Sequence, residues 1–321
     1  MATRRTAIQQ PLPADILLYI IDFVVPTTTR SPIALSPQSA TTKTIYSLTL
    51  TSRTIYPTAR RLLYSHCLYI STPHQLHNLL RSLSDPSDHS KPSPNKEYLL
   101  PYITSLYLRP FASCTTIKDL SVATAVRDLF SILSPHLRRL LVDMPLRSYY
   151  LDDSRPILRS AFENLTELEE FCSIRDELYL DTLLAPSEEA LVWSLWPKLR
   201  TLALYNVDVW SQRFWKGLRQ LENIETVVLT RGDGLGVVDI KREWNKQFGK
   251  LTETRSLNIV LVDIEAEHQI LGKDSWKKDD TMQVKVLNVP TSYYGDEDPV
   301  ALCQQWTKRS VLLGEPVARW T

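Results

Sequence analysis

The chain has 321 residues, of which 43% are hydrophobic and 23% are charged, and its formal net charge is +1. This composition is typical of a soluble globular protein, and the length suffices for one large domain or about two ordinary ones. A net charge so close to zero argues against a nucleic-acid-binding surface, which usually requires a dense basic patch. We therefore expect no nucleic-acid partner.

The four cysteines, Cys67, Cys114, Cys172 and Cys303, are scattered along the chain without a short paired spacing. This pattern indicates reduced thiols rather than a disulfide scaffold. The apolar stretch at 16–25 is only half of the roughly 20 residues that a membrane span requires. We expect a soluble protein of the cytoplasm and/or nucleus, with no membrane partner.

The polar residues 1–10 are expected to be disordered, and the first helix is predicted to begin at Pro13. A proline is tolerated in the first helical turn because its missing N–H would have no partner there. Asp15, Tyr19 and Asp22 follow at positions i, i+4 and i+7, so they share one solvated face of this helix. The remaining surface is apolar and wide for so short a helix.

The next segment, 26–43, is rich in Thr, Ser and Pro, and this composition predicts a flexible insert. From Ile45 to Leu62, apolar residues recur at steps of three and four, which predicts a helical stretch. Pro57 lies inside this stretch and should start a new helix or kink one, because its ring clashes with the preceding turn. Residues 11–70 thus predict a module of three helices with an insert.

A weak repeat begins at about residue 98, after a short predicted helix at 74–83 and a Pro/Ser-rich loop at 84–97. Each copy contains apolar residues at three fixed positions, and the copies are separated by roughly 25–35 residues, near or above the upper end for leucine-rich repeats. The copies start at Ile103, Leu137, Leu168, Leu199, Ile224 and Leu257, and the segment 284–289 is the last candidate.

Each copy would supply a short strand that is covered by a helical return, such as 122–133 or 187–195. One unit cannot bury its own apolar face, so neighbouring units would stack. Residues 98–321 are therefore predicted to form an irregular solenoid with a curved parallel sheet. The alternative is an ordinary α/β domain in which short apolar strands alternate with helices.

The N-terminal module carries an ordered set of residues that resembles the F-box, especially that of fungal F-box proteins. The set runs Leu12-Pro13-x-Asp15-Ile16-Leu17 and Ile20, then Leu48-x-Leu50-x-Ser52-Arg53, then Tyr56 and Ala59-Arg60-x-Leu62-Leu63-Tyr64. The long insert between Phe23 and Ile45 departs from the pattern of the family.

The resemblance implies an α/β protein with an N-terminal three-helix F-box and a C-terminal leucine-rich-repeat-like domain. In this family the F-box binds the adaptor subunit of the SCF ubiquitin ligase and, through it, a cullin, while the C-terminal domain captures a protein substrate. The expected function is a non-catalytic receptor subunit for an unknown protein target. The residues that the resemblance places against the adaptor are Leu12, Pro13, Ile16, Leu17, Ile20, Leu48 and Leu50.

An alternative remains, in which the same apolar residues pack onto the rest of the chain. Large exposed apolar patches usually mark interfaces, which favours docking. In the alternative, the protein is a repeat-based interaction scaffold whose F-box-like helices serve its own folding or a complex unrelated to ubiquitin.

No motif in the sequence indicates an enzyme, a cofactor or a metal site. Cys67, His74 and His77 lack a fourth ligand and a paired Cys-x-x-Cys, so their spacing does not predict zinc. The glycine-rich segment 232–236 lacks the third glycine of a dinucleotide fingerprint and the Lys-Ser or Lys-Thr of a phosphate loop. We expect no catalytic residues.

Four of the eight tryptophans, Trp193, Trp196, Trp210 and Trp215, cluster within about one repeat. In a stacked repeat domain most of them should belong to the core. Tryptophans that remain on the surface are good interface anchors. We therefore consider Trp210 and Trp215 as candidates for contact with a substrate.

Overall fold

The structure of the protein is a computed structural model. The predicted disordered residues 1–10 and nearly all of the predicted loop at 84–97 lie outside the residues that it describes. The described ranges are 12–25, 32–84, 99–111, 117–147, 154–182, 189–248, 256–266, 270–273, 282–293 and 295–314.

One parallel sheet of eight strands, arranged in sequence order, runs through the described chain. This arrangement confirms the predicted α/β class and the predicted parallel sheet, and each predicted repeat copy contains one strand. The strands are β1 (Tyr69–Ile70), β2 (Ser105–Leu108), β3 (Arg139–Val142), β4 (Glu170–Ser173), β5 (Thr201–Tyr205), β6 (Thr226–Thr230), β7 (Leu257–Asp263) and β8 (Met282–Asn288).

The register of the sheet aligns the repeat positions into rows. Leu106, Leu140, Phe171, Leu202 and Val227 are successive partners across β2 to β6. All are at most 1% exposed and belong to the large core on one face of the sheet. Because side chains alternate along a strand, the neighbouring row faces the opposite side of the sheet. The periodic apolar residues of the sequence therefore build two separate core layers.

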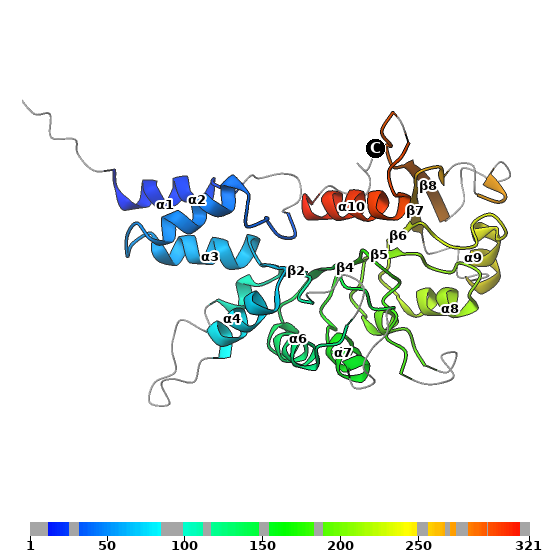
Figure 1. The fold of residues 1–321 in the computed structure, drawn as a ribbon, viewed down its shortest axis with the longest axis horizontal. Coiled ribbons are helices and arrows are strands. Elements are labelled where there is room, and N and C mark those ends of the chain that lie inside the picture. Colours follow the sequence, from blue (N-terminus) through cyan, green and yellow to red (C-terminus); the bar gives the residue numbers. More distant parts are fainter. Residues whose placement is uncertain are drawn as a thin grey trace, which may run out of the picture.

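Helices cover one face of the sheet, on the lower side of Figure 1. The predicted helix at 74–83 and the predicted return at 122–133 are both present. The predicted return at 187–195 is instead a single 3-10 turn in its described part. This turn contains the buried Trp193 and ends at the buried Trp196. The helical elements between β1 and β7 are α4 (Pro73–Ser84), η1 (Leu100–Tyr102), α6 (Leu120–Leu133), α7 (Ser154–Glu163), η3 (Val192–Leu195), α8 (Gln212–Gln220) and α9 (Ile240–Phe248).

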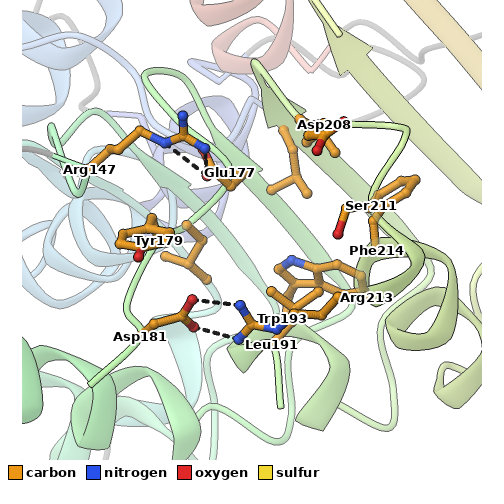
Figure 2. Close-up of a pocket in the computed structure, with 13 residues that line it drawn as sticks. Arg147, Glu177, Tyr179, Asp181, Leu191, Trp193, Asp208, Ser211, Arg213 and Phe214 are labelled. Atoms are coloured by element: carbon orange, nitrogen blue, oxygen red, sulfur yellow. Dashed lines mark hydrogen bonds and ion pairs between the residues drawn. The ribbon is translucent and has the colours of Figure 1, made fainter. Parts of the chain in front are cut away.

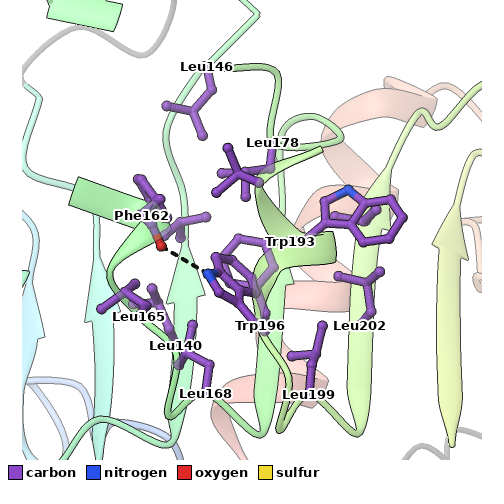
Figure 3. Packing of buried hydrophobic residues seen from close by; sticks show 14 of the residues in the cluster. Leu140, Leu146, Phe162, Leu165, Leu168, Leu178, Trp193, Trp196, Leu199 and Leu202 are labelled. Atoms are coloured by element: carbon purple, nitrogen blue, oxygen red, sulfur yellow. Dashed lines mark hydrogen bonds between the residues drawn. The ribbon is translucent and has the colours of Figure 1, made fainter. Parts of the chain in front are cut away.

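Tryptophans fill the centre of this helical core. Trp196 is fully buried, and its indole Nε1 donates a hydrogen bond to the carbonyl oxygen of Phe162 at 2.9 Å, which Figure 3 shows. Its ring meets that of Phe171 edge-on at 4.9 Å between centroids. Trp193, Trp215 and Trp244 are equally buried. This agrees with the expectation that most tryptophans belong to the core.

The opposite face of the sheet, which we call the α10 face, is crossed by helix α10 (Pro299–Leu312) (Figure 1). The buried residues of α10 are Cys303, Thr307 and Ser310, which are small and mostly polar. Thr307 lies within hydrogen-bonding distance of Thr230 on β6, with 3.1 Å between the hydroxyl oxygens. Larger apolar residues of α10 are only partly buried and pack around this contact on the core of the α10 face: Leu302, Trp306, Val311 and Leu312.

The N-terminal module contains the three predicted helices, α1 (Ala14–Asp22), α2 (Ala40–Thr49) and α3 (Tyr56–His66). Helix α1 begins one residue later than predicted, with Pro13 at its N-cap. Pro57 lies in the first turn of α3, as predicted. A small core of Ile21, Val25, Ile45, Ala59 and Leu62 holds the three helices together.

The predicted flexible insert at 26–43 is wrong for residues 32–43, whereas 26–31 lie outside the described ranges. Ile33 and Ala34 are 3% and 2% exposed and belong to the core of the α10 face. The backbone N–H of Ile33 donates to the carbonyl oxygen of Leu312 on α10 at 3.2 Å. The composition of the segment suggested no core, but its few apolar residues are buried against a surface formed by distant parts of the chain.

Candidate docking surface

Helix α1 exposes most of its apolar side chains. Of its nine residues only Ile21 is buried, whereas Leu12, Ile16, Ile20 and Phe23 are 46–58% exposed. Their spacing of three and four residues places them along one side of the helix and its N-terminal extension. The helix therefore presents an apolar stripe to solvent.

The other two helices add large apolar side chains to this end of the molecule. Tyr46 on α2, Leu50 at its C-cap and Tyr56 on α3 are 59%, 74% and 43% exposed. Half of the sixteen exposed large hydrophobic residues in the described chain lie between positions 12 and 56. A concentration of this kind usually marks an interaction site. We call these eight residues the docking surface: Leu12, Ile16, Tyr19, Ile20, Phe23, Tyr46, Leu50 and Tyr56.

Few intramolecular contacts hold α1 in place. Its inner side chain Ile21 packs in the small core of the module and, at its C-terminal end, the carboxylate of Asp22 lies 2.6 Å from the guanidinium of Arg61. Both partners of this ion pair are at least one-third exposed, so it contributes at most about 1 kcal/mol. The outer side of α1 contributes nothing to the apolar cores that the described residues form.

The structure places the residues predicted for the adaptor in two groups. Leu12, Pro13, Ile16, Ile20 and Leu50 are exposed. Leu17 and Leu48 are half-buried, and Leu48 packs against the small core of the module. Leu48 therefore supports the module from within.

The residues predicted to share a solvated face, Asp15, Tyr19 and Asp22, are all exposed. Two further exposed residues, Phe23 and Tyr46, were not among the residues predicted for the adaptor. Tyr46 lies one helical turn before Leu50, so the same spacing argument would have found it.

At the other end of the molecule, Trp215 is not available to a substrate, and its prediction as a contact residue is wrong. It is fully buried, and its Nε1 donates to the carbonyl oxygen of Val209 at 2.9 Å. Helix α8 turns Phe214, Trp215 and Leu218 inward because these residues lie on its apolar side.

Trp210 precedes α8 and is 65% exposed. It lines a groove of about 570 Å³ together with Val237 and Leu271. Both neighbours are also exposed apolar residues, 60% and 45% respectively. Trp210 thus remains a candidate for contact with a ligand.

The α10 face is occupied by the chain itself. The ammonium of Lys308 on α10 lies 2.9 Å from Asp143 Oδ2 and donates to the hydroxyl oxygen of Tyr107 at 2.5 Å. Burial alone would raise the pKa of Asp143, but the hydrogen bond and charge of Lys308, with Arg175, hold that pKa below its ordinary value. The surfaces open to a large ligand are therefore the docking surface and the loop edges of the sheet.

A scan against protein-family models, a search of curated proteins and a search of solved structures each give no match for this chain. In the part of the chain that the structure describes, no three His, Cys, Asp or Glu residues are grouped so as to hold a metal ion. The same part contains no helix with the length and apolar character needed to cross a bilayer.

Proposed function

We propose that this chain is the substrate-recognition subunit of an SCF-type ubiquitin ligase. Helices α1 to α3 are the F-box that docks on the adaptor, and the sheet domain, an irregular leucine-rich-repeat-like solenoid, holds a protein target. The subunit catalyses no bond chemistry. It raises the effective concentration of the target near a ubiquitin-charged enzyme.

The observation that carries this proposal is the exposure of the apolar residues on α1. Leu12, Ile16 and Ile20, which the F-box resemblance assigns to the adaptor, are about half exposed. Helices that served only the folding of their own chain would bury these side chains, because burial contributes about 1.5–3 kcal/mol for each large apolar side chain. An adaptor that covers them would gain this free energy on binding.

The arrangement of the sheet supports the second half of the proposal. Each strand carries the same apolar positions in the same register, as in Leu106, Leu140 and Leu202. Strands in sequence order with helices on one face are typical of stacked repeats, in which each unit contacts only its neighbours. Such domains offer extended surfaces for protein ligands.

Co-purification of the full chain with the SCF adaptor tests the proposal. The intact protein should capture the adaptor, and Leu12→Ala/Pro13→Ala should weaken capture. Ile20→Asp and Leu50→Asp should abolish it, since each places a charge on an exposed apolar position that the adaptor would cover. Val300→Asp is the matched control, because Val300 is 41% exposed in the first turn of α10 on the sheet domain.

The same variants separate the proposal from the scaffold alternative. Under that alternative the wild type captures no adaptor, and Ile20→Asp lowers the melting temperature because the helix serves folding. Deletion of residues 1–70 is a poorer test, because it also removes β1, which pairs with β2, and Ile33, which packs on the α10 face. Failure of the wild type to capture the adaptor contradicts the proposal.

A further inference from the structure

A pocket of about 190 Å³ lies at the carboxyl ends of β4 and β5, beneath the loops that follow β3, β4 and β5 (Figure 2). In open α/β sheets, ligands bind outside the carboxyl ends of the strands. Pockets for drug-sized molecules measure about 300–1,000 Å³, so this one is the size of a single large side chain.

The floor of the pocket is apolar and buried. Trp193, Leu204, Val207 and Phe214 line it and are at most 3% exposed. The rings of Trp193 and Phe214 pack edge to face with 6.0 Å between their centroids. Such a floor binds an apolar group and excludes a charged one, which would lose its hydration there.

The two arginines in the pocket wall already form ion pairs with carboxylates. Arg213 donates to both oxygens of Asp181, at 2.5 Å each, and also to the carbonyl oxygen of Glu189. Arg147 donates through Nε to Glu177 Oε1 at 3.0 Å. An anionic ligand would have to displace these ion pairs, so the pocket does not favour one.

Negative charge at the rim is not fully compensated. The second oxygen of Glu177, Oε2, is buried and accepts no hydrogen bond from any described residue. Asp208 is exposed and makes no ion pair with the described residues; its Oδ1 accepts only the backbone N–H of Trp210, at 2.8 Å. Ser211 also lines the rim, and its hydroxyl does not cap helix α8. A cationic group at this rim would gain electrostatic free energy.

The backbone beside the rim is strained. Leu178 has a φ of 62°, in the left-handed region that a leucine rarely adopts. The buried carboxylate of Asp176 holds it there, since Oδ1 accepts the N–H of Leu178 at 2.9 Å while Oδ2 accepts the N–H of Arg147 at 3.0 Å. Strained residues concentrate at ligand sites. Asp176 thereby joins two loops and places Glu177 and Arg147 on the rim.

We propose that this pocket binds the amino-terminal residue of a protein ligand. The large apolar side chain of that residue lies on the Trp193–Phe214 floor, and its free α-ammonium lies at the rim beside Asp208. A lysine or arginine side chain fits less well, because its charged end would reach the apolar floor. The inference deepens the proposed function and rests on it for the ligand being a protein.

Titration of the full chain with the amidated peptide Phe-Ala-Ala, followed by calorimetry or saturation-transfer NMR, tests the inference. The peptide should bind saturably. Acetylation of its N-terminus should weaken binding by about tenfold or more, because the charge-assisted hydrogen bonds are lost. Ala-Ala-Ala amide should also bind more weakly, because it leaves the floor uncovered.

Asp208→Asn should weaken binding of the peptide with a free N-terminus by about tenfold and leave binding of the acetylated peptide unchanged. Asp128→Asn, at an exposed position on α6, is the matched control and should change neither. The inference is overturned by the absence of saturable binding, by equal binding of the acetylated peptide, or by Asp208→Asn binding like wild type. Phenethylamine binding as tightly as the peptide would also overturn it, since the ligand would then be a small amine.

Adaptor capture, measured on the same preparations, keeps the two hypotheses distinct. Capture without peptide binding defeats the pocket assignment alone. Peptide binding without capture defeats the ubiquitin-ligase proposal alone.

Discussion

Lys308 on α10 lies 2.9 Å from the carboxylate of Asp143, which follows β3, although 165 residues separate them in the chain. The same ammonium stands 4.6 Å from the ring centroid of Tyr107, a cation–π contact. The side chain of Asp143 is 4% exposed, so the pair is sheltered from solvent. This polar cluster attaches the helix to the sheet together with partly buried apolar residues of α10, which pack on the same core: Leu302, Trp306, Val311 and Leu312.

Replacing Lys308 by methionine should therefore loosen α10. Asp143 would keep the Arg175 guanidinium at 2.6 Å, so we expect a loss of about 1–3 kcal/mol in the free energy of unfolding and not the larger loss of a fully unpaired charge. Urea unfolding measures the loss, and hydrogen exchange should become faster in α10 than in β5. Lys246→Met removes the exposed ion pair with Glu243 and should change stability by less than about 0.5 kcal/mol. Equal losses in the two variants would contradict the prediction.

The pH dependence of that difference follows from Asp143. Its pKa lies below the ordinary value of 3.8 in the folded protein. The stabilisation by ionised Asp143 is thus fully present above 3.8 and is lost as the pH falls through the lower folded pKa. Urea unfolding should show a constant difference between wild type and Lys308→Met above pH 3.8, and a shrinking one below it. A difference that grows on acidification would contradict the assignment.

The two tryptophans that flank the start of α8 should respond in opposite ways to truncation. Trp215→Ala should lower the free energy of unfolding by about 3–5 kcal/mol, because it opens a cavity and leaves the Val209 carbonyl without its donor. Trp210→Ala removes a side chain that is 65% exposed and should change stability by less than about 0.5 kcal/mol. Chemical denaturation with matched protein concentrations compares them. Similar losses in both variants would show that Trp210 also belongs to the core.

The strands could be predicted from the sequence because their signal is local. Each copy of the repeat carries apolar residues at the same offsets, as in Leu140 and Leu202, and these positions become register partners of Phe171 between them. The wide apolar surface of α1 could also be predicted from the sequence. Its exposure was expected only from the F-box resemblance, because the apolar pattern by itself does not say whether Ile16 and Ile20 face a core or solvent.

The parts that escaped prediction depend on contacts between distant residues. Ile33 is buried because its segment meets α10, nearly the whole chain away, at the carbonyl of Leu312. The pocket forms because three loops converge, and its ion pair between Arg213 and Asp181 spans 32 residues. Neither the periodicity nor the composition of the sequence around Ile33, Asp181 or Arg213 indicates these long-range contacts.

Gly217 tests how tightly the pocket floor is packed. A Cβ at this position would lie 2.7 Å from the indole carbon Cη2 of Trp193, closer than atoms normally approach. Gly217→Ala should therefore displace Trp193 and lower the free energy of unfolding by about 1–3 kcal/mol, as overpacking does. Gly232→Ala is the control, since the nearest atom to its Cβ would be Leu235 Cδ1 at 3.4 Å, which is an ordinary van der Waals contact. Thermal unfolding followed by tryptophan fluorescence measures the melting temperatures of both variants. An unchanged melting temperature in Gly217→Ala would show that Trp193 can shift without a loss of stability.

Asp176 should give the protein a distinct loss of stability between acidic and neutral pH. Burial, and then the charge of Glu177, raise its pKa to about 7 in the folded protein, against the backbone hydrogen bonds that favour the ionised form. The ordinary pKa is 3.8, so the folded state holds the proton more strongly than the unfolded state does. Stability from this group is thus fully present below pH 3.8 and is lost as the pH rises to about 7.

Asp176→Asn should remove this pH dependence of stability, and it should also cost the protein one hydrogen bond. The NH2 of asparagine can only donate, whereas the hydroxyl oxygen of protonated Asp176 can still accept an N–H, so one of the bonds from Leu178 and Arg147 is lost and the variant should be less stable than wild type at about pH 5. The difference should shrink at about pH 8, where wild-type Asp176 is ionised and buried. Urea unfolding at the two pH values measures it, with Asp128→Asn keeping the wild-type dependence. A constant difference would mean that Asp176 does not titrate in this range, and the two loops would then be joined by a carboxylate that stays ionised.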